Sequence, residues 1–359
     1  MATTIATTID AQREGGSTFG SSGELPVVHL ACSRGGHLDV LLRHQEAFEG
    51  CRLVWVTQSS ARAERLSSEG AEVHVLGEWH GTALRAETVR SIWRSFELVV
   101  RQRPRVVVTS GTGIVVPFCL MARVVGAKLV FVETAARVRS PSRSGRVLSR
   151  IARHVIAQWD DMQAIYRGAT IVRTSIVEEL ATDVDVEGAG TFVAVGTHSQ
   201  PFDRLLEMVD RAAEAGILPV PITAQVGSSR RGMRHADTRA LMTPQEMEET
   251  IRNTRHVVCH AGAGTISTSL RLGRRPLVLA RLKCHGEHFD DHQQEIVDKL
   301  ATLDLVVPLG DEITASDVAR ASRPLRLLPE LERLPRLVDC LREHVWEALG
   351  EGVPGASGR

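Results

Sequence analysis

Short runs of β-branched and other apolar residues alternate along the chain with longer stretches of mixed polarity. The apolar runs predict β-strands at residues 27–33, 52–58, 72–77, 105–111, 128–134, 191–197, 219–227, 256–262, 275–281 and 304–310. The stretches between them, such as residues 82–102, have the pattern of helices. Apolar strands separated by helices are typical of a parallel sheet that is covered on both faces, so the sequence predicts an α/β protein.

The strand-and-helix pattern runs twice along the chain. An acidic, glycine-containing stretch at residues 182–190 separates the two halves. We therefore expect two domains, residues 25–185 and 186–330. Residues 1–24, rich in Thr, Ser and Gly, are expected to form a flexible tail, and residues 331–359 a C-terminal helix and tail that packs on either domain.

Composition narrows the class of protein. Lys and Arg together number 43, as do Asp and Glu, so the formal net charge is zero and a dedicated nucleic-acid binder is disfavoured. Aromatic residues make up 4% of the chain, which argues against base-stacking platforms. The six cysteines show no CxxC spacing, so neither a disulfide framework nor a zinc site is expected. No run reaches the roughly 18 apolar residues of a membrane span, and no signal peptide is visible, so we expect a cytoplasmic protein.

The turn after the first strand contains a candidate base. In parallel α/β sheets, ligands collect at the carboxyl ends of the strands. Gly35 and Gly36 allow a sharp turn there, and His37 falls at the start of the next helix. A neutral His at that place can accept a proton from a substrate hydroxyl, although a His that only caps the loop fits equally well.

Two more glycine-rich turns suit anions. Ser110, Gly111, Thr112 and Gly113 follow the fourth strand, where amides at a helix start favour phosphate. This run lacks the dinucleotide fingerprint, so NAD binding is disfavoured. In the second half, Gly196 and Thr197 end one strand. Another strand is followed by a run that suits a pyrophosphate, or that only makes a turn: His260, Gly262, Ala263, Gly264 and Thr265.

Residues 282–295 form the densest polar cluster, and three interpretations remain open. His288 and His292 lie four residues apart, a spacing that suits a metal site on a helix. Asp290 and Asp291 also fit a solvated helix start, where the helix dipole favours carboxylates. In the third interpretation, the Asp, His and Gln side chains bind sugar hydroxyls.

An arginine row is predicted in residues 137–153, which contain six Arg and no acid. Arg143, Arg146, Arg150 and Arg153 are three, four and three residues apart, so they are expected to line one helix face. Such a face suits anionic lipid headgroups or a lipid pyrophosphate, or is simply solvated.

These motifs together resemble a glycosyltransferase family. The first half resembles the acceptor-binding subunit of the dolichol-linked chitobiose-forming GlcNAc transferase and of bacterial exopolysaccharide glycosyltransferases. The motifs that carry this resemblance are SRGGHL, VVVTSGTGIVVP, VFVETAARVRSPSRSG and AQW. The second half resembles the donor-binding catalytic subunit of the same systems, through the motifs VAVGTHSQPFDRLL, AQVGSS, VVCHAGAGTI, RPLVLAR and GEHFDDHQQE. Both are similar to the peptidoglycan GlcNAc transferase, so the resemblance implies a GT-B fold: two Rossmann-like parallel-sheet domains facing a central cleft, with the two subunits fused in one chain.

The resemblance implies an inverting, metal-independent transfer from a UDP-sugar to a polyprenyl-pyrophosphate-linked saccharide, with no cofactor. His37 would be the base, and the loop from His260 to Thr265, with Gly196 and Thr197, would hold the donor pyrophosphate. Asp291, His292 and Gln293 would bind the donor sugar. The acceptor side would comprise Gly35, Gly36, Ser110, Gly111, Thr112, Gly113 and Glu133.

Two departures from the family favour its bacterial exopolysaccharide branch. Thr268 stands where the chitobiose-forming enzymes carry Glu, and we do not expect the membrane anchor with which their acceptor subunit usually begins. We therefore expect peripheral attachment to the inner face of the cytoplasmic membrane through the arginine row. Arg281 is a candidate partner for a uronic acid carboxylate. The alternatives are a soluble UDP-sugar epimerase, a non-catalytic sugar-nucleotide-binding subunit, and a metal-dependent hydrolase built on the 285–292 cluster.

Overall fold

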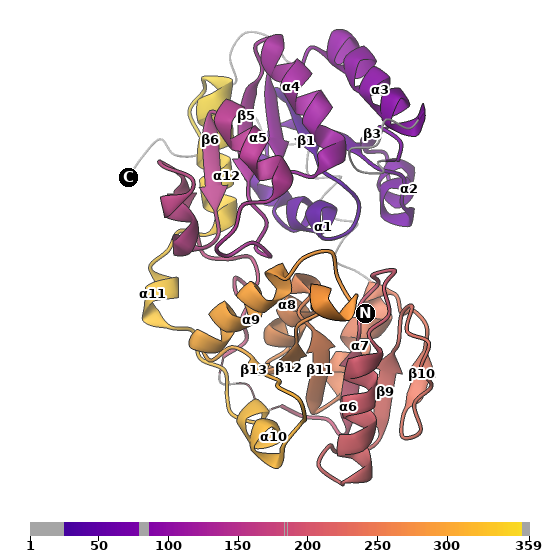
Figure 1. Cartoon of the computed structure of the whole chain (residues 1–359). Coiled ribbons are helices and arrows are strands. Elements are labelled where there is room, and N and C mark those ends of the chain that lie inside the picture. Colours follow the sequence, from indigo (N-terminus) through magenta and orange to yellow (C-terminus); the bar gives the residue numbers. More distant parts are fainter. Residues whose placement is uncertain (1–24, 79–85, 183, 185, 354–359) are drawn as a thin grey trace.

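The computed structural model describes residues 25–78, 86–182, 184 and 186–353, and contains two parallel β-sheets (Figure 1). The predicted tail at residues 1–24 and the expected helix start at 82–85 lie outside the described residues. The first sheet has the strand order β3-β2-β1-β4-β5-β6-β7, and the second the order β10-β9-β8-β11-β12-β13. Every pair of neighbouring strands is parallel.

The strands of the first sheet are β1 (Val27–Ala31), β2 (Arg52–Thr57), β3 (Glu72–Val75), β4 (Val106–Thr109), β5 (Lys128–Val132), β6 (His154–Ala157) and β7 (Thr170–Ile171). Those of the second sheet are β8 (Thr191–Ala194), β9 (Ile222–Gln225), β10 (Asp237–Arg239), β11 (His256–His260), β12 (Leu277–Leu279) and β13 (Val307–Pro308). All the strands predicted from the apolar runs are therefore confirmed.

The helices of the first half are α1 (Gly36–Arg43), α2 (Ala61–Ser68), α3 (Ala86–Gln102), α4 (Val116–Val124) and α5 (Arg143–Ile151). Those of the second half are α6 (Asp203–Glu214), α7 (Pro244–Asn253), α8 (Ala263–Arg271), α9 (His292–Thr302) and α10 (Ala315–Ala321), followed by α11 (Pro329–Glu332) and α12 (Leu337–Leu349). Short 3₁₀ turns are η2 (Gln45–Phe48), η3 (Gly113–Val115), η4 (Asp160–Ala164) and η5 (Lys283–His285).

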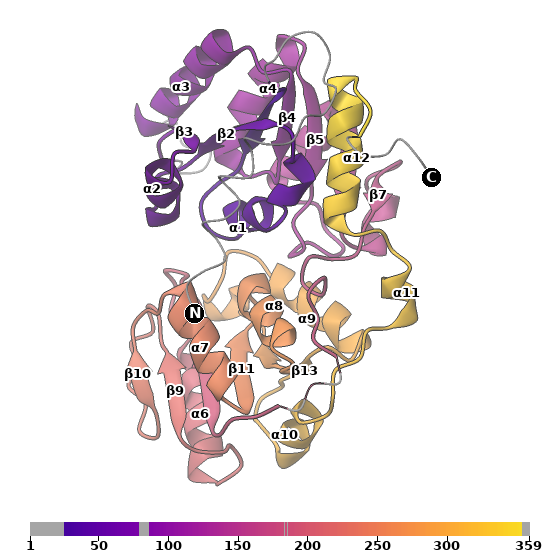
Figure 2. The same ribbon diagram turned by 180° about the vertical axis from the view of Figure 1, so that it is seen from behind.

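Each sheet is buried between two helical layers, as its apolar strands require. In the first half, α3, α4 and α5 pack on one face, where Val99, Phe118 and Leu148 share a core. The other face is covered by α1 and α12, through Leu41 and Trp346 among others (Figures 1 and 2). The C-terminal helix, which was expected on either domain, thus completes the first one. In the second half, α8 and α9 cover one face and α6 and α10 the other.

Three strands were not predicted. β6 follows the arginine-rich segment directly, β7 has two residues, and β10 is a fully exposed strand of sequence DTR. β10 pairs only with β9, at the edge of the second sheet, and has no apolar side chain to reveal it.

Both sheets have a topological switch point, where ligands bind in open α/β sheets. In the first sheet it lies between β1 and β4, and in the second between β8 and β11, because each of these pairs has crossovers leading in opposite directions. The loops after β1 and β4 and after β8 and β11 are the glycine-rich ones. The fold therefore brings four candidate loops together in two pairs.

Candidate active site

His37 lies at the switch point of the first sheet and is oriented by the loop after β4. Gly35 has a φ of 79°, a conformation that favours glycine, and the chain turns there into α1. The Nδ1 of His37 donates to the Ser110 carbonyl at 2.9 Å. Since a carbonyl only accepts, Nδ1 carries the proton and Nε2 keeps a lone pair. Burial lowers the pKa of His37, so the ring is neutral at neutral pH.

Two amides of the loop from Ser110 to Gly113, where we expected an anion to bind, already have acceptors within the protein. The amide of Gly111 donates to Thr109 Oγ1 at 3.0 Å, and that of Thr112 donates to Ser144 Oγ at 2.9 Å. The loop continues into η3, and α4 begins only at Val116. The loop's hydrogen bonds thus orient His37 and contact the start of α5, and the anion site here stays a prediction.

Glu133, expected in the acceptor cleft, has its carboxylate turned inward. The residue is 1% exposed. Its carboxylate accepts from Tyr166 Oη at 2.5 Å and from the amide and hydroxyl of Ser142 at 3.1 Å. Ser142 in turn caps α5 through the Gly145 amide. Glu133 also borders a small cavity beside His37, whose other walls include Gly36, Ser110, Thr134 and Gln158. Glu133 therefore stabilises the loops around His37 through its hydrogen bonds.

Removing the Tyr166 hydroxyl is expected to destabilise the protein. In Tyr166→Phe, the buried Glu133 carboxylate loses one hydrogen bond without a change of shape at the ring. Hydrogen bonds to charged groups contribute about 1.5–3 kcal/mol, and we expect the free energy of unfolding to fall by about that amount in urea denaturation. Unchanged stability would mean that the Glu133 network does not help to hold the loop.

In the second sheet, the His260 ring lies between two glycines. A Cβ at Gly196 would approach His260 Nε2 to 2.4 Å, and one at Gly262 to 2.2 Å. The ring's Nδ1 donates to the Ala194 carbonyl at 3.3 Å, and burial lowers the pKa of His260 to about 4. The ring is thus neutral and tightly enclosed. These glycines are required by the close approach of the ring, which spacing alone could not reveal.

The start of α8 offers unpaired backbone amides. Gly262, the N-cap residue, provides no side-chain cap. No acceptor in the described part of the chain bonds the amides of Ala263, Gly264 or Thr265. Unpaired amides at the positive end of a helix favour an anion. Nearby, Thr197 is exposed beside Gly196.

Gln225 was missed by sequence reasoning, although it fixes the loop after β8. Its side-chain oxygen accepts from the Gly196 amide, and its side-chain nitrogen donates to the Gly196 carbonyl, both at 3.1 Å. The buried Gln within the apolar run PVPITAQVG was the available signal, since a buried amide needs partners.

Arg281 does not reach a ligand, contrary to the expectation that it binds a uronic acid. It is 1% exposed and stacks on Phe202, with 4.6 Å between the guanidinium carbon and the ring centroid. Its guanidinium donates to backbone carbonyls of Val195, Gln200, Pro201 and Glu287. Arg281 therefore fastens the loop after β8 to the 282–291 segment.

The 288–293 segment lies at the start of α9. Asp291 Oδ1 accepts from the Lys283 amide at 2.7 Å, and Gln293 Oε1 accepts from the Arg281 amide at 3.0 Å. His288, Asp290 and His292 bring ligand-type atoms within 4.8 Å of one another, as do His154, His344 and Glu347 elsewhere. In the first set, one Asp290 oxygen is hydrogen-bonded to both imidazoles. The geometry observed is thus a hydrogen-bonded cluster of residues that transition metals also use.

Polar contacts join the two halves at this level. Arg137, after β5, donates to Asp290 Oδ2 at 2.8 Å. Glu295 accepts from the Arg139 amide and from Ser140 Oγ, both at 3.0 Å. Arg43 of α1 donates to Ser267 of α8 at 3.2 Å, and Lys299 pairs with Asp160 and Asp161. The loops that follow the strands of each sheet therefore face each other.

The arginine row is shorter than expected. Arg143, Arg146 and Arg150 lie on α5 and are exposed. Arg153 lies beyond the end of the helix at Ile151 and pairs with Glu347 of α12 at 2.8 Å. The expectation that Arg153 shares the row is wrong, because β6 begins at His154 and ends the helical periodicity.

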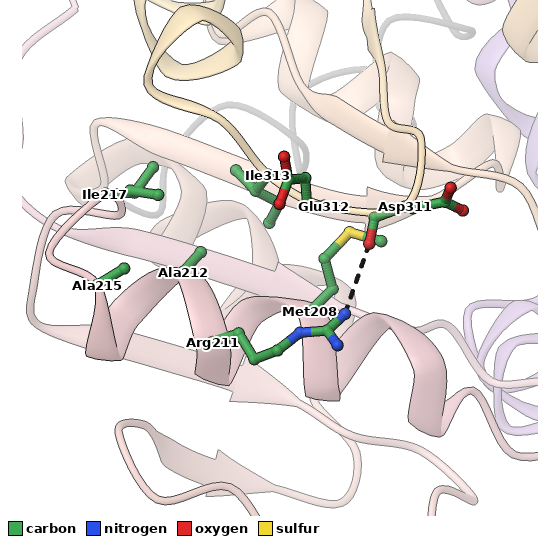
Figure 3. Close-up of a pocket in the computed structure, with 8 residues that line it drawn as sticks. All are labelled: Met208, Arg211, Ala212, Ala215, Ile217, Asp311, Glu312 and Ile313. Atoms are coloured by element: carbon green, nitrogen blue, oxygen red, sulfur yellow. Dashed lines mark hydrogen bonds between the residues drawn. The ribbon is translucent and has the colours of Figure 1, made fainter.

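A separate pocket lies between α6 and residues 311–313 (Figure 3). Its walls are mostly aliphatic, and Arg211 donates to the Asp311 carbonyl across it at 3.5 Å. None of the residues described above lines it.

Sequence comparisons match each half to a different family. Residues 80–174 match the family described as oligosaccharide biosynthesis protein Alg14 like, and residues 191–319 match the glycosyltransferase family 28 C-terminal domain. The UDP-N-acetylglucosamine transferase subunit ALG14 of Eremothecium gossypii is 30% identical over 185 residues, 43% of this chain and 82% of that subunit. Human ALG14 is 34% identical over 85 residues, 22% of this chain, and the match spans 39% of the human subunit.

One relative spans both halves. The UDP-N-acetylglucosamine–N-acetylmuramyl-(pentapeptide) pyrophosphoryl-undecaprenol N-acetylglucosamine transferase of Methylococcus capsulatus is 28% identical over 303 residues, 82% of this chain and 80% of that protein.

Solved structures agree with the expected GT-B fold. MurG of Acinetobacter baumannii superposes with a TM-score of 0.58 at 15% identity, covering 90% of this chain and 99% of that one. UDP-GlcNAc 2-epimerase of Methanocaldococcus jannaschii superposes with a TM-score of 0.59 at 10% identity, covering 91% and 100%. At these identities the likeness shows the fold alone, and it confirms the GT-B prediction. Together with the sequence matches, it shows that this chain belongs to the Alg14-like family and carries a glycosyltransferase family 28 C-terminal domain in the same polypeptide.

Proposed function

We propose that the protein is an inverting, metal-independent glycosyltransferase. It moves a sugar from a UDP-sugar to a polyprenyl-pyrophosphate-linked saccharide in exopolysaccharide or cell-surface glycan synthesis. The observation that carries the proposal is the state of His37: a neutral ring with Nδ1 bonded to Ser110 and Nε2 free to accept a proton. A general base on the acceptor hydroxyl needs this protonation state.

We propose that the donor binds to the second half. The amides at the start of α8 would bind the pyrophosphate and stabilise the UDP leaving group, which is the task of a cation in other enzymes. Asp291, His292 and Gln293 would contact the sugar. In the reaction, the acceptor oxygen attacks the anomeric carbon from the face opposite UDP, the bond to UDP breaks, and the acceptor proton passes to His37.

A transfer assay tests this proposal. Radiolabelled UDP-Glc, UDP-Gal, UDP-GlcNAc and UDP-GlcA are each incubated with the protein, host membrane lipids and EDTA. Label that enters an organic-soluble, mild-acid-labile product supports the transferase and identifies its donor. If no donor gives such a product, the transferase proposal fails.

An epimerase is the second candidate, because UDP-GlcNAc 2-epimerases share the fold. It would change the UDP-sugar itself in the absence of any lipid. Chromatography of the nucleotide fraction from the same assay separates the two functions. A subunit that only binds the nucleotide would give neither product.

We also propose that the protein attaches peripherally to the cytoplasmic face of the membrane, through the layer formed by α3, α4 and α5. No helix in the described ranges is long and apolar enough to cross a bilayer. Four apolar side chains of α3 nevertheless point outward at helical spacing: Val89, Trp93, Phe96 and Val100. Trp93 is 65% exposed and packs against Phe96. Val124 of α4 and the α5 arginines extend this surface.

Replacing both aromatic rings tests this surface. Burying one large apolar side chain contributes about 1.5–3 kcal/mol, so Trp93→Ser with Phe96→Ser is expected to weaken binding to phosphatidylglycerol vesicles at least on the order of tenfold. Vesicle sedimentation measures the effect. Leu241→Ser, at an exposed position in the other half, serves as the control. Equal losses in both proteins, or none in the double variant, would contradict the assignment.

A further inference from the structure

A chain of three side chains crosses from the first half to the second. Arg137 Nη2 donates to Asp290 Oδ2 at 2.8 Å, and Asp290 Oδ1 accepts from His292 Nδ1. Arg137 lies in the loop after β5, which ends at Val132, whereas His292 is the first residue of α9. Asp290 is therefore the link between an acceptor-side loop and the expected donor-sugar segment.

The charge of Asp290 fixes the tautomer of His292. Burial acts against ionisation, but the hydrogen bonds from His292 and Arg137 hold the pKa of Asp290 well below its usual range. An ionised carboxylate only accepts, so His292 Nδ1 carries the proton and Nε2 keeps a lone pair. Burial lowers the pKa of His292, which keeps its ring neutral at neutral pH.

Gln293, unlike His292, offers a hydrogen-bond donor. Its side-chain oxygen is occupied by the Arg281 amide, so its NH₂ group is the part left for a ligand. Together, His292 offers an acceptor and Gln293 a donor. A sugar hydroxyl is both donor and acceptor, and hydroxyls whose orientation matches this pair gain both bonds, whereas a wrong match leaves buried polar groups unpaired.

We infer that Arg137 is a positioning residue, which acts through Asp290 to hold His292 as a hydrogen-bond acceptor for the donor sugar. The inference rests on the proposed function, and it adds that the acceptor half takes part in recognising the donor. Arg137 suits this role because its planar guanidinium bonds one carboxylate oxygen of Asp290 and leaves the other for the imidazoles of His292 and His288.

Other contacts keep the halves together when Arg137 is changed. In the same loop, the Arg139 amide and Ser140 Oγ both donate to the carboxylate of Glu295. Lys299 of α9 pairs with Asp160 and Asp161. Ser140→Ala therefore weakens the junction without touching the Arg137–Asp290–His292 chain, which makes it the matched control.

Binding measurements separate recognition of the sugar from recognition of the nucleotide. Calorimetry is carried out with UDP and with the tightest-binding of UDP-Glc, UDP-Gal, UDP-GlcNAc and UDP-GlcA. In Arg137→Met we expect affinity for the UDP-sugar to fall on the order of tenfold, affinity for UDP to stay unchanged, and Arg137→Lys to restore part of the loss. Ser140→Ala should match the parent protein. Equal losses for UDP and UDP-sugar, or a loss in Ser140→Ala as large as in Arg137→Met, would overturn the inference.

The tautomer is read directly by ¹⁵N NMR of histidine-labelled protein, with His292→Gln used to assign the signal. We expect His292 to be protonated at Nδ1 in the parent protein and to mix tautomers in Arg137→Met. A protonated Nε2 in the parent protein would refute the role assigned to His292. The NMR measurement needs no turnover, so it tests the role of His292 independently of the transfer assay.

Discussion

His37→Ala is expected to abolish most of the transfer activity while leaving donor binding intact. General bases contribute about 10²–10⁴-fold to a rate, so kcat should fall within that range. UDP affinity should be unchanged, because the donor loops lie on the other sheet. Steady-state kinetics with calorimetry for UDP measure both quantities. His74→Ala, on the edge strand β3, controls for loss of an imidazole elsewhere.

The pH profile gives a second reading of His37. Burial lowers the pKa of this ring below 6.5, so the neutral, active form predominates at neutral pH. As pH falls through the lowered pKa, the base becomes protonated and kcat/KM, which reports the free enzyme, should decline with a midpoint below the usual range of histidine. A kcat that His37→Ala leaves intact, or a profile without this acid limb, would show that another group takes the proton.

Gly264→Ala is expected to block nucleotide binding without harming the fold. A Cβ at this position meets no atom within 4 Å, and alanine is favoured over glycine in a helix by about 0.5–1 kcal/mol. Stability should therefore stay equal or rise. The new methyl group would stand next to the α8 amides that we propose for the pyrophosphate. We expect UDP affinity to fall on the order of tenfold or more, about 1.4 kcal/mol.

The control is Gly310→Ala, which also adds a methyl group in open space but lies after β13, outside the site. Thermal unfolding and UDP calorimetry are compared for both variants. Gly262→Ala should behave differently from either, because its methyl group would displace the His260 ring and disturb the loop itself. Normal UDP binding by Gly264→Ala would place the pyrophosphate elsewhere.

Much of the fold was predictable because parallel sheets place long apolar runs in the core. The runs at residues 27–33 and 256–262 gave β1 and β11 and thus the loops that follow them. β10 was not predicted because this exposed edge strand has no apolar run. The position of α12 could not be predicted, since packing on the first sheet depends on side chains brought together from distant segments.

For the candidate site, the sequence predicts only which residues lie in the loops that follow the strands. The positions of His37 and of the α8 amides at strand ends could be predicted because they depend on local sequence alone. The hydrogen-bond partners of Arg281, Glu133 and Thr112 could not be predicted, because they lie far along the chain, in Val195, Tyr166 and Ser144. A charged or polar residue near a motif can serve a ligand or the fold. Only the tertiary partners distinguish these roles, as they do for Arg137 and Asp290.

The most direct test is transfer by the purified chain alone. A synthetic polyprenyl-pyrophosphate saccharide and the donor UDP-sugar are incubated with this single polypeptide in excess EDTA, and the product is analysed by mass spectrometry and NMR. We expect one added sugar with inverted anomeric configuration, at a rate that EDTA does not change. A retained configuration, a requirement for a second protein, or loss of activity in EDTA would contradict it.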